Sequence, residues 1–226
     1  MVTKRMNLED LEKIDSKKMY QTYDKWPEIA KDGFDNDFEK FDAKGIDHIV
    51  FSGMGGSGSI GDVISAILSK EDIHVSNVKG YHLPKTVDSN TLVISTSVSG
   101  NTKETLTVLE KAQKTDAKIA VFSSGGMIQK FSKTNNLFFQ EISMIHSPRA
   151  SFPKFLFAIL NILKEIIPIK KTHVEEAISS LEITRNNIFS NNLIGDNISL
   201  KLAEWIKEIP LIYYPWGLQS AAIRFK

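Results

Sequence analysis

The 226-residue sequence contains no cysteine, so it can form neither a disulfide framework nor a thiolate nucleophile. This composition fits a reducing compartment, and we expect a cytoplasmic protein. The sequence also lacks a long apolar run and an apolar N-terminal signal core. Its most apolar segment, residues 155–169, is interrupted by Asn161, Lys164, Glu165 and Pro168. A membrane-spanning helix needs about 20 consecutive apolar residues, so we expect no membrane partner.

The sequence has little excess charge of either sign. Its formal net charge is +1, and lysine and glutamate are spread along the chain rather than grouped in blocks. Proteins that bind nucleic acid carry clustered Lys and Arg, so we expect no nucleic-acid partner. The hydrophobic content of 42% is ordinary for a globular chain. The length suits one α/β domain with helical additions, or one domain and part of another.

The most informative stretch is residues 92–105, where a short apolar run leads into a turn rich in hydroxyl groups. Leu92 to Ile94 predict a buried parallel strand, and from Thr102 onward the apolar spacing predicts a helix. Gly100 supplies a conformationally permissive turn. The first turn of a helix leaves N–H groups unpaired and carries partial positive charge, so this arrangement can bind an anion. The hydroxyl groups belong to Ser95, Thr96, Ser97, Ser99 and Thr102.

The turn holds no Lys or Arg ahead of Thr102, so we expect a compact phosphate bound by neutral donors. A hydrogen bond to a charged group contributes roughly 1.5–3 kcal/mol, and several such bonds would give useful affinity. The plainer alternative is that Ser99 or Asn101 only caps the helix. One cap explains one hydroxyl group, but it does not explain Ser97, Ser99 and Thr102 together. Phosphate binding is therefore the favoured interpretation.

A glycine-rich turn follows an earlier predicted strand, residues 46–52, and precedes a predicted helix that starts at Asp62. Glycines at positions 53, 55 and 58 match the dinucleotide fingerprint GxGxxG, so an NAD(P)-binding oxidoreductase is an alternative. That fingerprint also needs an acidic residue at the end of the next strand, where it binds the ribose. The next predicted strand, residues 73–78, is followed by residues 79–82, which contain no carboxylate. The missing carboxylate weakens the nucleotide interpretation.

Two more apolar runs, residues 117–122 and 137–142, predict further strands, and residues 127–133 predict a helix between them. The alternation predicts an α/β fold with a doubly wound, mainly parallel five-stranded sheet flanked by helices. Ligands of such sheets bind at the carboxyl ends of the strands. Both turns lie at such ends, so we expect them to converge on one pocket.

Arg149 follows the last predicted strand, between Pro148 and Ala150. A lone arginine is usually a solvated surface charge, but this one is expected near the carboxyl edge of the sheet, so a role in the site is equally open. His146 nearby is a weaker candidate, because a lone histidine is more often structural.

Three motifs together resemble those of the archaeal-type bifunctional phosphoglucose/phosphomannose isomerases of the sugar isomerase (SIS) domain superfamily. They are Gly53-Met-Gly-Gly-Ser-Gly58, Ser97-Val-Ser-Gly-Asn-Thr-Lys-Glu-Thr105 and Pro148-Arg-Ala150. The resemblance implies a SIS fold and an aldose–ketose isomerase that interconverts glucose or mannose 6-phosphate and fructose 6-phosphate through a cis-enediol. It further implies a homodimer that uses no metal and no nucleotide cofactor. Val98 departs from the family, which often carries an aromatic residue there.

The resemblance also assigns roles to residues. Arg149 is the catalytic residue, because a guanidinium favours the charge of the developing enediolate. The family's catalytic Glu and His are expected in a second SIS domain, past Lys226. A catalytically incomplete phosphosugar-binding or regulatory module is therefore the main alternative to an enzyme. The residues expected to bind the substrate phosphate are Gly55, Gly56, Ser57, Ser97, Ser99, Gly100 and Thr102.

We divide the chain into four expected segments. Residues 1–45 form an N-terminal lead-in of two or three amphipathic helices, and residues 46–150 form the SIS phosphosugar-binding domain. Residues 151–208 form a helical connection. Residues 209–226 form the first β-turn-α unit of a second, incomplete SIS domain, with a strand at 209–214 and a helix at 218–226.

Overall fold

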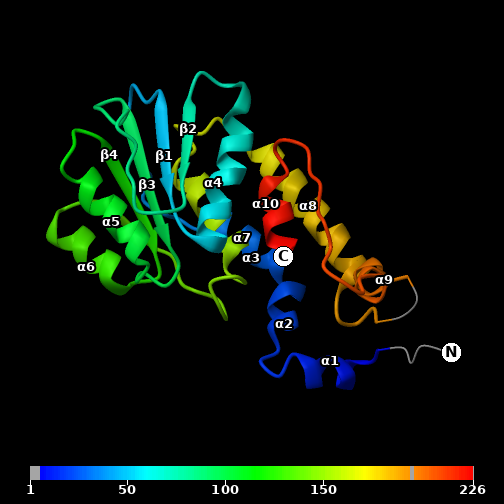
Figure 1. The fold of residues 1–226 in the computed structure, drawn as a ribbon. Coiled ribbons are helices and arrows are strands. Elements are labelled where there is room, and N and C mark those ends of the chain that lie inside the picture. The colour runs from blue at the N-terminus through cyan, green and yellow to red at the C-terminus, as the bar shows by residue number, and fades with distance from the viewer. Residues whose placement is uncertain (1–5, 194–195, 226) are drawn as a thin grey trace.

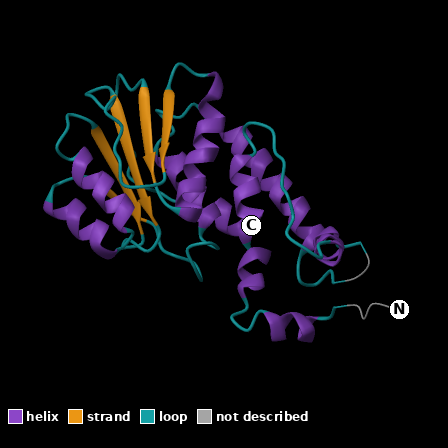
Figure 2. Ribbon diagram, viewed as in Figure 1, coloured by secondary structure: helices purple, strands orange, loops and turns teal. Residues whose placement is uncertain are grey.

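The computed structural model describes residues 6–193 and 196–225. Its centre is a five-stranded sheet with the strand order β2-β1-β3-β4-β5, and every neighbouring pair is parallel (Figures 1 and 2). The expected doubly wound α/β sheet is confirmed, and it is wholly rather than mainly parallel. The strands are β1 (His48–Ser52), β2 (His74–Val78), β3 (Thr91–Ser97), β4 (Lys118–Ser123) and β5 (Phe138–Glu141).

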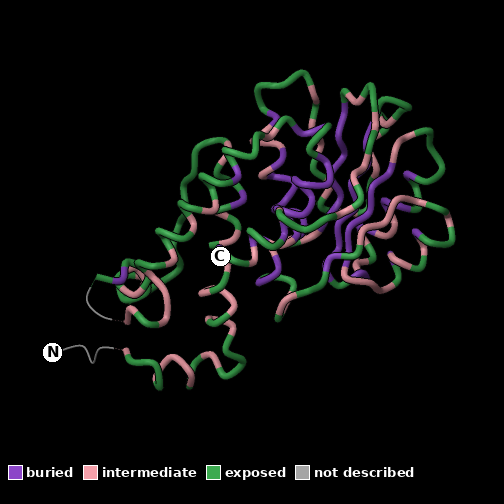
Figure 3. The backbone as a smooth tube through the Cα atoms, turned by 180° about the vertical axis from the view of Figure 1, so that it is seen from behind, coloured by how far each residue is buried: buried purple, intermediate pink, exposed green. Residues whose placement is uncertain are grey.

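Helices cover both faces of the sheet, so the central strands are apolar on both sides. Helices α4 (Gly55–Ile67) and α7 (Phe152–Ile162) share a buried cluster with Ile49, Phe51 and Ile94. Helices α5 (Lys103–Ala112) and α6 (Gly126–Thr134) share another with the alternate strand residues, such as Val50 and Val93. Successive strand residues point to opposite faces, which explains why two clusters draw on the same strands. Figure 3 shows the buried residues gathered in the strands and in the neighbouring helices, with exposed residues around them.

The lead-in consists of three helices, α1 (Leu8–Ile14), α2 (Met19–Asp24) and α3 (Trp26–Asp35), as expected. Pro27 lies in the first turn of α3, where its missing N–H costs nothing. Helix α3 packs mainly against α7 and α8 (Lys171–Ile188). The side chain of Asn161, on α7, secures this contact, since its Nδ2 donates to the carbonyl oxygens of Phe34 and Asn36.

Two boundaries differ from expectation, and both lie at the predicted turns. Strand β3 continues to Ser97, so Ser95 and Thr96 belong to the strand and not to the turn. Helix α4 begins at Gly55, seven residues before the predicted start at Asp62. Its glycines are explained by close packing, because a Cβ on Gly61 would lie 2.5 Å from Asn77 Oδ1 and 2.6 Å from the Phe51 ring. Tertiary contacts therefore outweigh the low helix propensity of glycine here. A short 3₁₀ turn, η1 (Leu68–Lys70), extends the helix.

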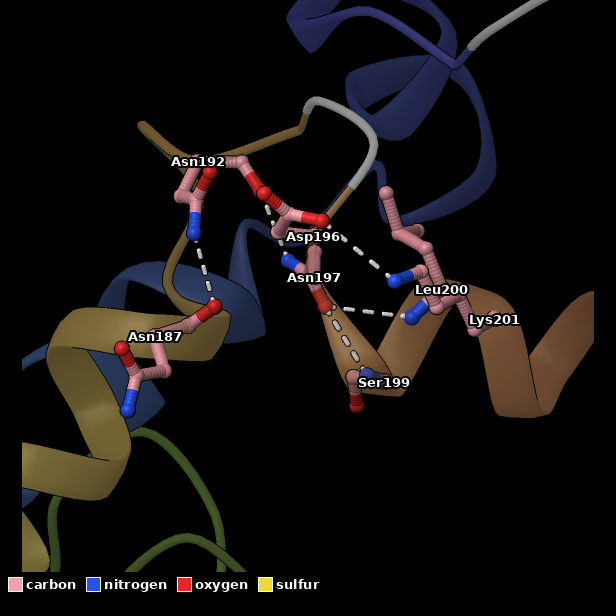
Figure 4. Close-up of polar contacts among 7 residues, drawn as sticks. All are labelled: Asn187, Asn192, Asp196, Asn197, Ser199, Leu200 and Lys201. Carbon is pink, nitrogen blue, oxygen red and sulfur yellow. Dashed lines mark hydrogen bonds and ion pairs between the residues drawn. The ribbon is translucent and has the colours of Figure 1, made fainter.

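Helix α9 (Ile198–Trp205) follows α8, and Asn197 joins the two (Figure 4). The Asn197 side chain is 2% exposed and caps α9, because its Oδ1 accepts hydrogen bonds from the backbone N–H groups of Ser199 and Leu200. Its Nδ2 donates to the carbonyl oxygens of Ile188 and Asn192. One buried amide thus satisfies the end of one helix and the start of the next.

The predicted strand over residues 209–214 was wrong. These residues form no strand, and Ile209 and Tyr213 are 93% and 90% exposed. A strand needs a neighbouring strand for its backbone hydrogen bonds, and no strand of the described sheet lies beside this segment. The predicted β-turn-α unit is therefore only a helix, α10 (Gln219–Phe225), which packs against α4. The last predicted helical residue, Lys226, lies outside the described residues.

No helix in residues 6–193 and 196–225 combines the length and the apolar character that crossing a membrane requires.

Stability is expected to fall in mild acid because of His48, which is 7% exposed at the start of β1. Its Nε2 lies 3.0 Å from Ser76 Oγ. Burial, reinforced by the nearby His74 ring, lowers the pKa of His48, while Asp88, the Thr86 backbone and Asp47 oppose the shift. The unfolded chain therefore binds this proton at a higher pH than the folded chain. The contribution of the neutral His48 side chain to the free energy of unfolding is complete above pH ~6.5. It is lost as the pH falls from there towards the lower pKa of His48 in the folded chain.

Thermal unfolding at pH 7.5, 6.5 and 5.5 tests this expectation. His48→Gln should flatten the dependence of the melting temperature on pH below 6.5, whereas His82→Gln, at an exposed position, should leave it unchanged. A slope that is the same in wild type and His48→Gln would show that other groups cause the acid sensitivity.

Candidate functional site

The predicted turns flank the point where the order of the sheet reverses. After β1 the chain continues to β2 on one side, and after β3 it continues to β4 on the other. Ser52 and Ser95 are register partners near the carboxyl ends of β1 and β3. In open α/β sheets, ligands bind in the crevice at such a switch point. The glycine loop (residues 53–58) and the hydroxyl turn (residues 97–102) leave these two neighbouring strands, so both lie at this crevice.

The hydroxyl turn is organised around Ser97, which is 2% exposed. Ser97 Oγ accepts a hydrogen bond from the backbone N–H of Gly100 at 3.1 Å and lies 2.9 Å from Thr102 Oγ1. Ser99 is exposed on the same turn, and its Oγ accepts from the N–H of Asn101 at 3.4 Å. The structure thus brings Ser97 and Thr102 together and leaves Ser99 facing solvent.

Simple capping does not explain this turn. The N-cap residue of α5 is Thr102, rather than Ser99 or Asn101, and no side chain caps the helix there. Thr102 Oγ1 turns towards Ser97 instead. The backbone donors of the first turn of α5 therefore stay available to an anion, as the phosphate interpretation requires.

The loop between β4 and α6 supports the hydroxyl turn. Gly100 has a φ of +70°, and a Cβ at this position would lie 1.8 Å from the carbonyl oxygen of Gly125. The N–H of Ile128 donates to the Gly100 carbonyl, and the N–H of Met127 donates to Asn101 Oδ1. The sequence signal for this contact is the Gly125-Gly126 pair, which lies outside the three motifs.

A buried polar layer lies beneath the crevice. Within the described residues, the hydroxyl groups of Ser52, Ser95, Thr96 and Thr105 are buried and have no hydrogen-bond partner. A buried hydroxyl group costs free energy unless it is hydrogen-bonded. Their concentration at the carboxyl ends of β1 and β3 and the start of α5 distinguishes this edge from the apolar middle of the sheet.

The glycine loop forms the first turn of α4, where Gly55 has a φ of +52° and Ser57 is 8% exposed. A Cβ on Gly58 would lie 2.5 Å from the Gly53 carbonyl oxygen and 3.1 Å from Cε of Lys79. Lys79 Nζ in turn lies 2.6 Å from Oδ2 of the buried Asp62. Lys79, at the position of the ribose carboxylate, is thus engaged with α4. The close approach that GxGxxG offers to a pyrophosphate serves protein packing here, which further weakens the dinucleotide alternative.

The segment that carries Arg149 lies beside the glycine loop, because the Pro148 carbonyl oxygen is 3.8 Å from the Cβ position of Gly56. Arg149 Nη2 donates to the carbonyl oxygen of Arg224 on α10 at 2.6 Å. His146 has a φ of +56°, and its Nε2 lies 2.9 Å from the carbonyl oxygen of Lys17 in the lead-in. That contact matches the structural role expected for His146. Sequence reasoning missed Arg224, whose position becomes visible only through the docking of α10.

A cavity of about 820 Å³ lies between the lead-in and helices α7, α8 and α10. Arg149 and Arg224 line it, but the residues of the hydroxyl turn do not. It is therefore not the pocket at which we expected the two turns to converge. The described residues contain no cluster of three His, Cys, Asp or Glu side chains that could hold a metal ion.

Residues 44–140, which include β1 to β4 and most of β5, match the family model of the SIS domain. These residues therefore form a SIS domain. It is similar to the bifunctional phosphoglucose/phosphomannose isomerase of Thermoplasma acidophilum, with 33% identity over 181 residues that cover 79% of this chain and 53% of that protein. It is also similar to the D-glucosamine-6-phosphate 4-epimerase of Sulfolobus acidocaldarius, with 26% identity over 92% of this chain and 64% of that protein.

Among solved structures, the fold is similar to that of tagatose-6-phosphate ketose/aldose isomerase from Escherichia coli. The TM-score is 0.51 at 18% identity, and the match covers 79% of this chain and 51% of that chain. At this identity the likeness shows the fold alone. The chain spans about half the length of the bifunctional isomerases that it matches across most of its own length.

Proposed function

We propose that this chain binds a hexose phosphate at the crevice between β1 and β3, and that it acts as an aldose–ketose isomerase. The substrates would be glucose 6-phosphate or mannose 6-phosphate and fructose 6-phosphate. The observation that carries the proposal is the hydroxyl turn, where Ser97 and Thr102 face each other beside uncapped N–H groups at a sheet switch point. The similarity to bifunctional phosphoglucose/phosphomannose isomerases supports it.

Each group of the site has a role in this proposal. The hydroxyl groups of Ser97, Ser99 and Thr102 and the N–H groups of α5 bind the phosphate. Ser57 and the N–H groups of Gly55 and Gly56 contribute from the first turn of α4. These donors are neutral. The bound phosphate therefore keeps the double negative charge that it carries in solution.

Arg149 stabilises the enediolate that forms when a proton leaves C2 or C1 of the sugar, because its guanidinium remains protonated at neutral pH. Proton transfer needs a base within about 3 Å of these carbons. Hydroxyl groups, glycines and an arginine do not supply such a base. The motif residues therefore account for binding and charge stabilisation, and the base must be a separate group.

A second candidate is a sugar-phosphate epimerase, since the similarity to the glucosamine-6-phosphate epimerase covers 92% of this chain. Both activities need the same phosphate site, and they differ in the sugar carbon that reacts. A third candidate, a phosphosugar-binding module without turnover, would use the same phosphate site. Binding tests the shared proposal, and turnover separates the candidates.

Calorimetric titration of the 226-residue chain tests the binding. We expect fructose 6-phosphate, glucosamine 6-phosphate and inorganic phosphate to bind, and fructose and NAD to bind at least about a hundredfold more weakly than fructose 6-phosphate. Coupled assays on the same sample then measure isomerisation and epimerisation. Tight NAD binding together with no binding of fructose 6-phosphate would contradict the proposal and favour the oxidoreductase alternative.

A further inference from the structure

Arg224 lies directly over the glycine loop, although it is more than 160 residues away in sequence. It belongs to α10, which packs against α4 (Figure 1). A Cβ on Gly56 would lie 3.3 Å from Arg224 Nη1, so the guanidinium rests on the backbone of Gly56. Any side chain at position 56 would come between the loop and this cation. The glycine loop is thus open on the side that Arg224 approaches.

The Arg224 guanidinium is held in this orientation by aromatic rings and by a backbone contact. Its Cζ lies 4.1 Å from the centroid of the Phe152 ring and 5.5 Å from that of Trp26. Arg224 Nη2 donates to the carbonyl oxygen of Arg149 at 2.9 Å, while Arg149 Nη2 donates to the carbonyl oxygen of Arg224. Stacking on rings and planar hydrogen bonding are the contacts that distinguish arginine from lysine.

Two like charges are therefore held together beside the glycine loop. Burial lowers the pKa of Arg224, Tyr23 opposes this shift, and Arg149 adds to it. No carboxylate is among the groups that shift the pKa of Arg224. A phosphate oxygen beside Arg224 would favour the charged form of its guanidinium.

We propose that Arg224 is a second cationic residue of the substrate site, which contacts a phosphate oxygen of the anion bound at the glycine loop. This inference rests on the proposed function and adds a residue that none of the three motifs contains. Guanidinium groups bind phosphate through paired N–H donors, and the N–H groups at the start of α4 face the same anion. Helix α10, which follows the five strands of the sheet in sequence, thus contributes a residue to the phosphate site.

The test compares binding of inorganic phosphate and fructose 6-phosphate to wild type and to Arg224→Gln. We expect both affinities to fall by about tenfold or more, because the variant loses a charge-assisted hydrogen bond to the phosphate. Arg224→Lys should recover only part of the loss, since an ammonium group cannot form the paired contact. Arg185→Gln is the matched control. Arg185 lines the same cavity as Arg224, but it pairs with Glu28 and donates to the Asp24 carbonyl, away from the glycine loop.

The outcomes separate this inference from the proposed function. If wild type binds phosphate and loses it on Ser97→Ala with Ser99→Ala, but Arg224→Gln binds normally, Arg224 has no role and the function stands. If wild type binds neither ligand, both proposals fail. A loss in Arg185→Gln as large as that in Arg224→Gln would assign the effect to general charge and overturn the inference.

A measurement on the wild type covers the case in which the Arg224 variants do not fold. Phenylglyoxal modifies arginine side chains, and mass spectrometry can follow the peptide that contains Arg224. Inorganic phosphate should protect Arg224 and leave Arg185 equally reactive. Equal labelling of Arg224 with and without phosphate would contradict the proposal.

Discussion

Replacing Gly100 by alanine is expected to lower the free energy of unfolding by about 3 kcal/mol or more. Gly100 has a φ of +70°, a conformation that costs an L-residue roughly 1–2 kcal/mol. The new Cβ would also lie 1.8 Å from the oxygen and 2.5 Å from the carbon of the Gly125 carbonyl. These are backbone atoms, which cannot swing away, so the β4–α6 loop must shift at a further cost of roughly 1–3 kcal/mol. Denaturant unfolding measures the loss.

Gly45→Ala is the matched control. Gly45 has a φ of +69°, but a Cβ there would meet no atom within 4 Å. This variant should lose only the conformational part, about 1 kcal/mol. Equal losses in the two variants would show that the contact between the hydroxyl turn and the β4–α6 loop is looser than the structure has it. Gly100→Ala should also weaken phosphate binding, which Gly45→Ala should not affect.

The sheet could be predicted from sequence because its signals are local. Buried parallel strands are short apolar runs, and Ile49, Val93 and Val121 each lie in such a run. Alternation with helices then determines a parallel doubly wound sheet, and the switch point follows from the strand order. The end of β3 was less predictable, because Ser95 and Thr96 are polar residues that are buried in a strand.

What the sequence left undetermined depends on contacts between distant segments. The run Ile209 to Tyr214 has strand composition, but strand formation requires a partner strand that composition cannot supply. The glycines at 58 and 61 were assigned to a loop, whereas they are helical residues that admit Lys79 and Phe51 to close contact. Local patterns indicate permissive backbone, and only the packed structure shows whether a ligand or a side chain uses it.

The candidate site likewise has one part that the local sequence predicts and another that depends on contacts between distant segments. Ser97, Ser99, Gly100 and Thr102 lie within one motif, so their neighbourhood was predictable, and the structure adds how Ser97 joins Gly100 to Thr102. Arg149 was placed near the carboxyl edge by its position after the last strand. Its relation to Arg224 depends on the docking of α10 against α4, for which no local signal exists.

Changing Ser97 and Ser99 together to alanine is expected to weaken binding of fructose 6-phosphate by about a hundredfold or more. Each hydroxyl group contributes a hydrogen bond to a doubly charged phosphate, worth roughly 1.5–3 kcal/mol. The single variants should differ from each other. Ser99 is exposed and contacts only its own turn, so Ser99→Ala should reduce affinity and leave the melting temperature unchanged.

Ser97→Ala should reduce both affinity and stability, because the buried Ser97 Oγ also accepts from Gly100 and neighbours Thr102. Thr107→Ala provides the control, since its hydroxyl group lies on the same helix, α5, and donates to the Lys103 carbonyl rather than to the turn. Calorimetry gives the affinities and thermal unfolding gives the stabilities. Wild-type affinity in the double variant would place the phosphate elsewhere, with the arginines beside the glycine loop as the next place to look. A loss in Thr107→Ala equal to that in Ser99→Ala would mean that the effect comes from α5 as a whole and not from the hydroxyl groups of the turn.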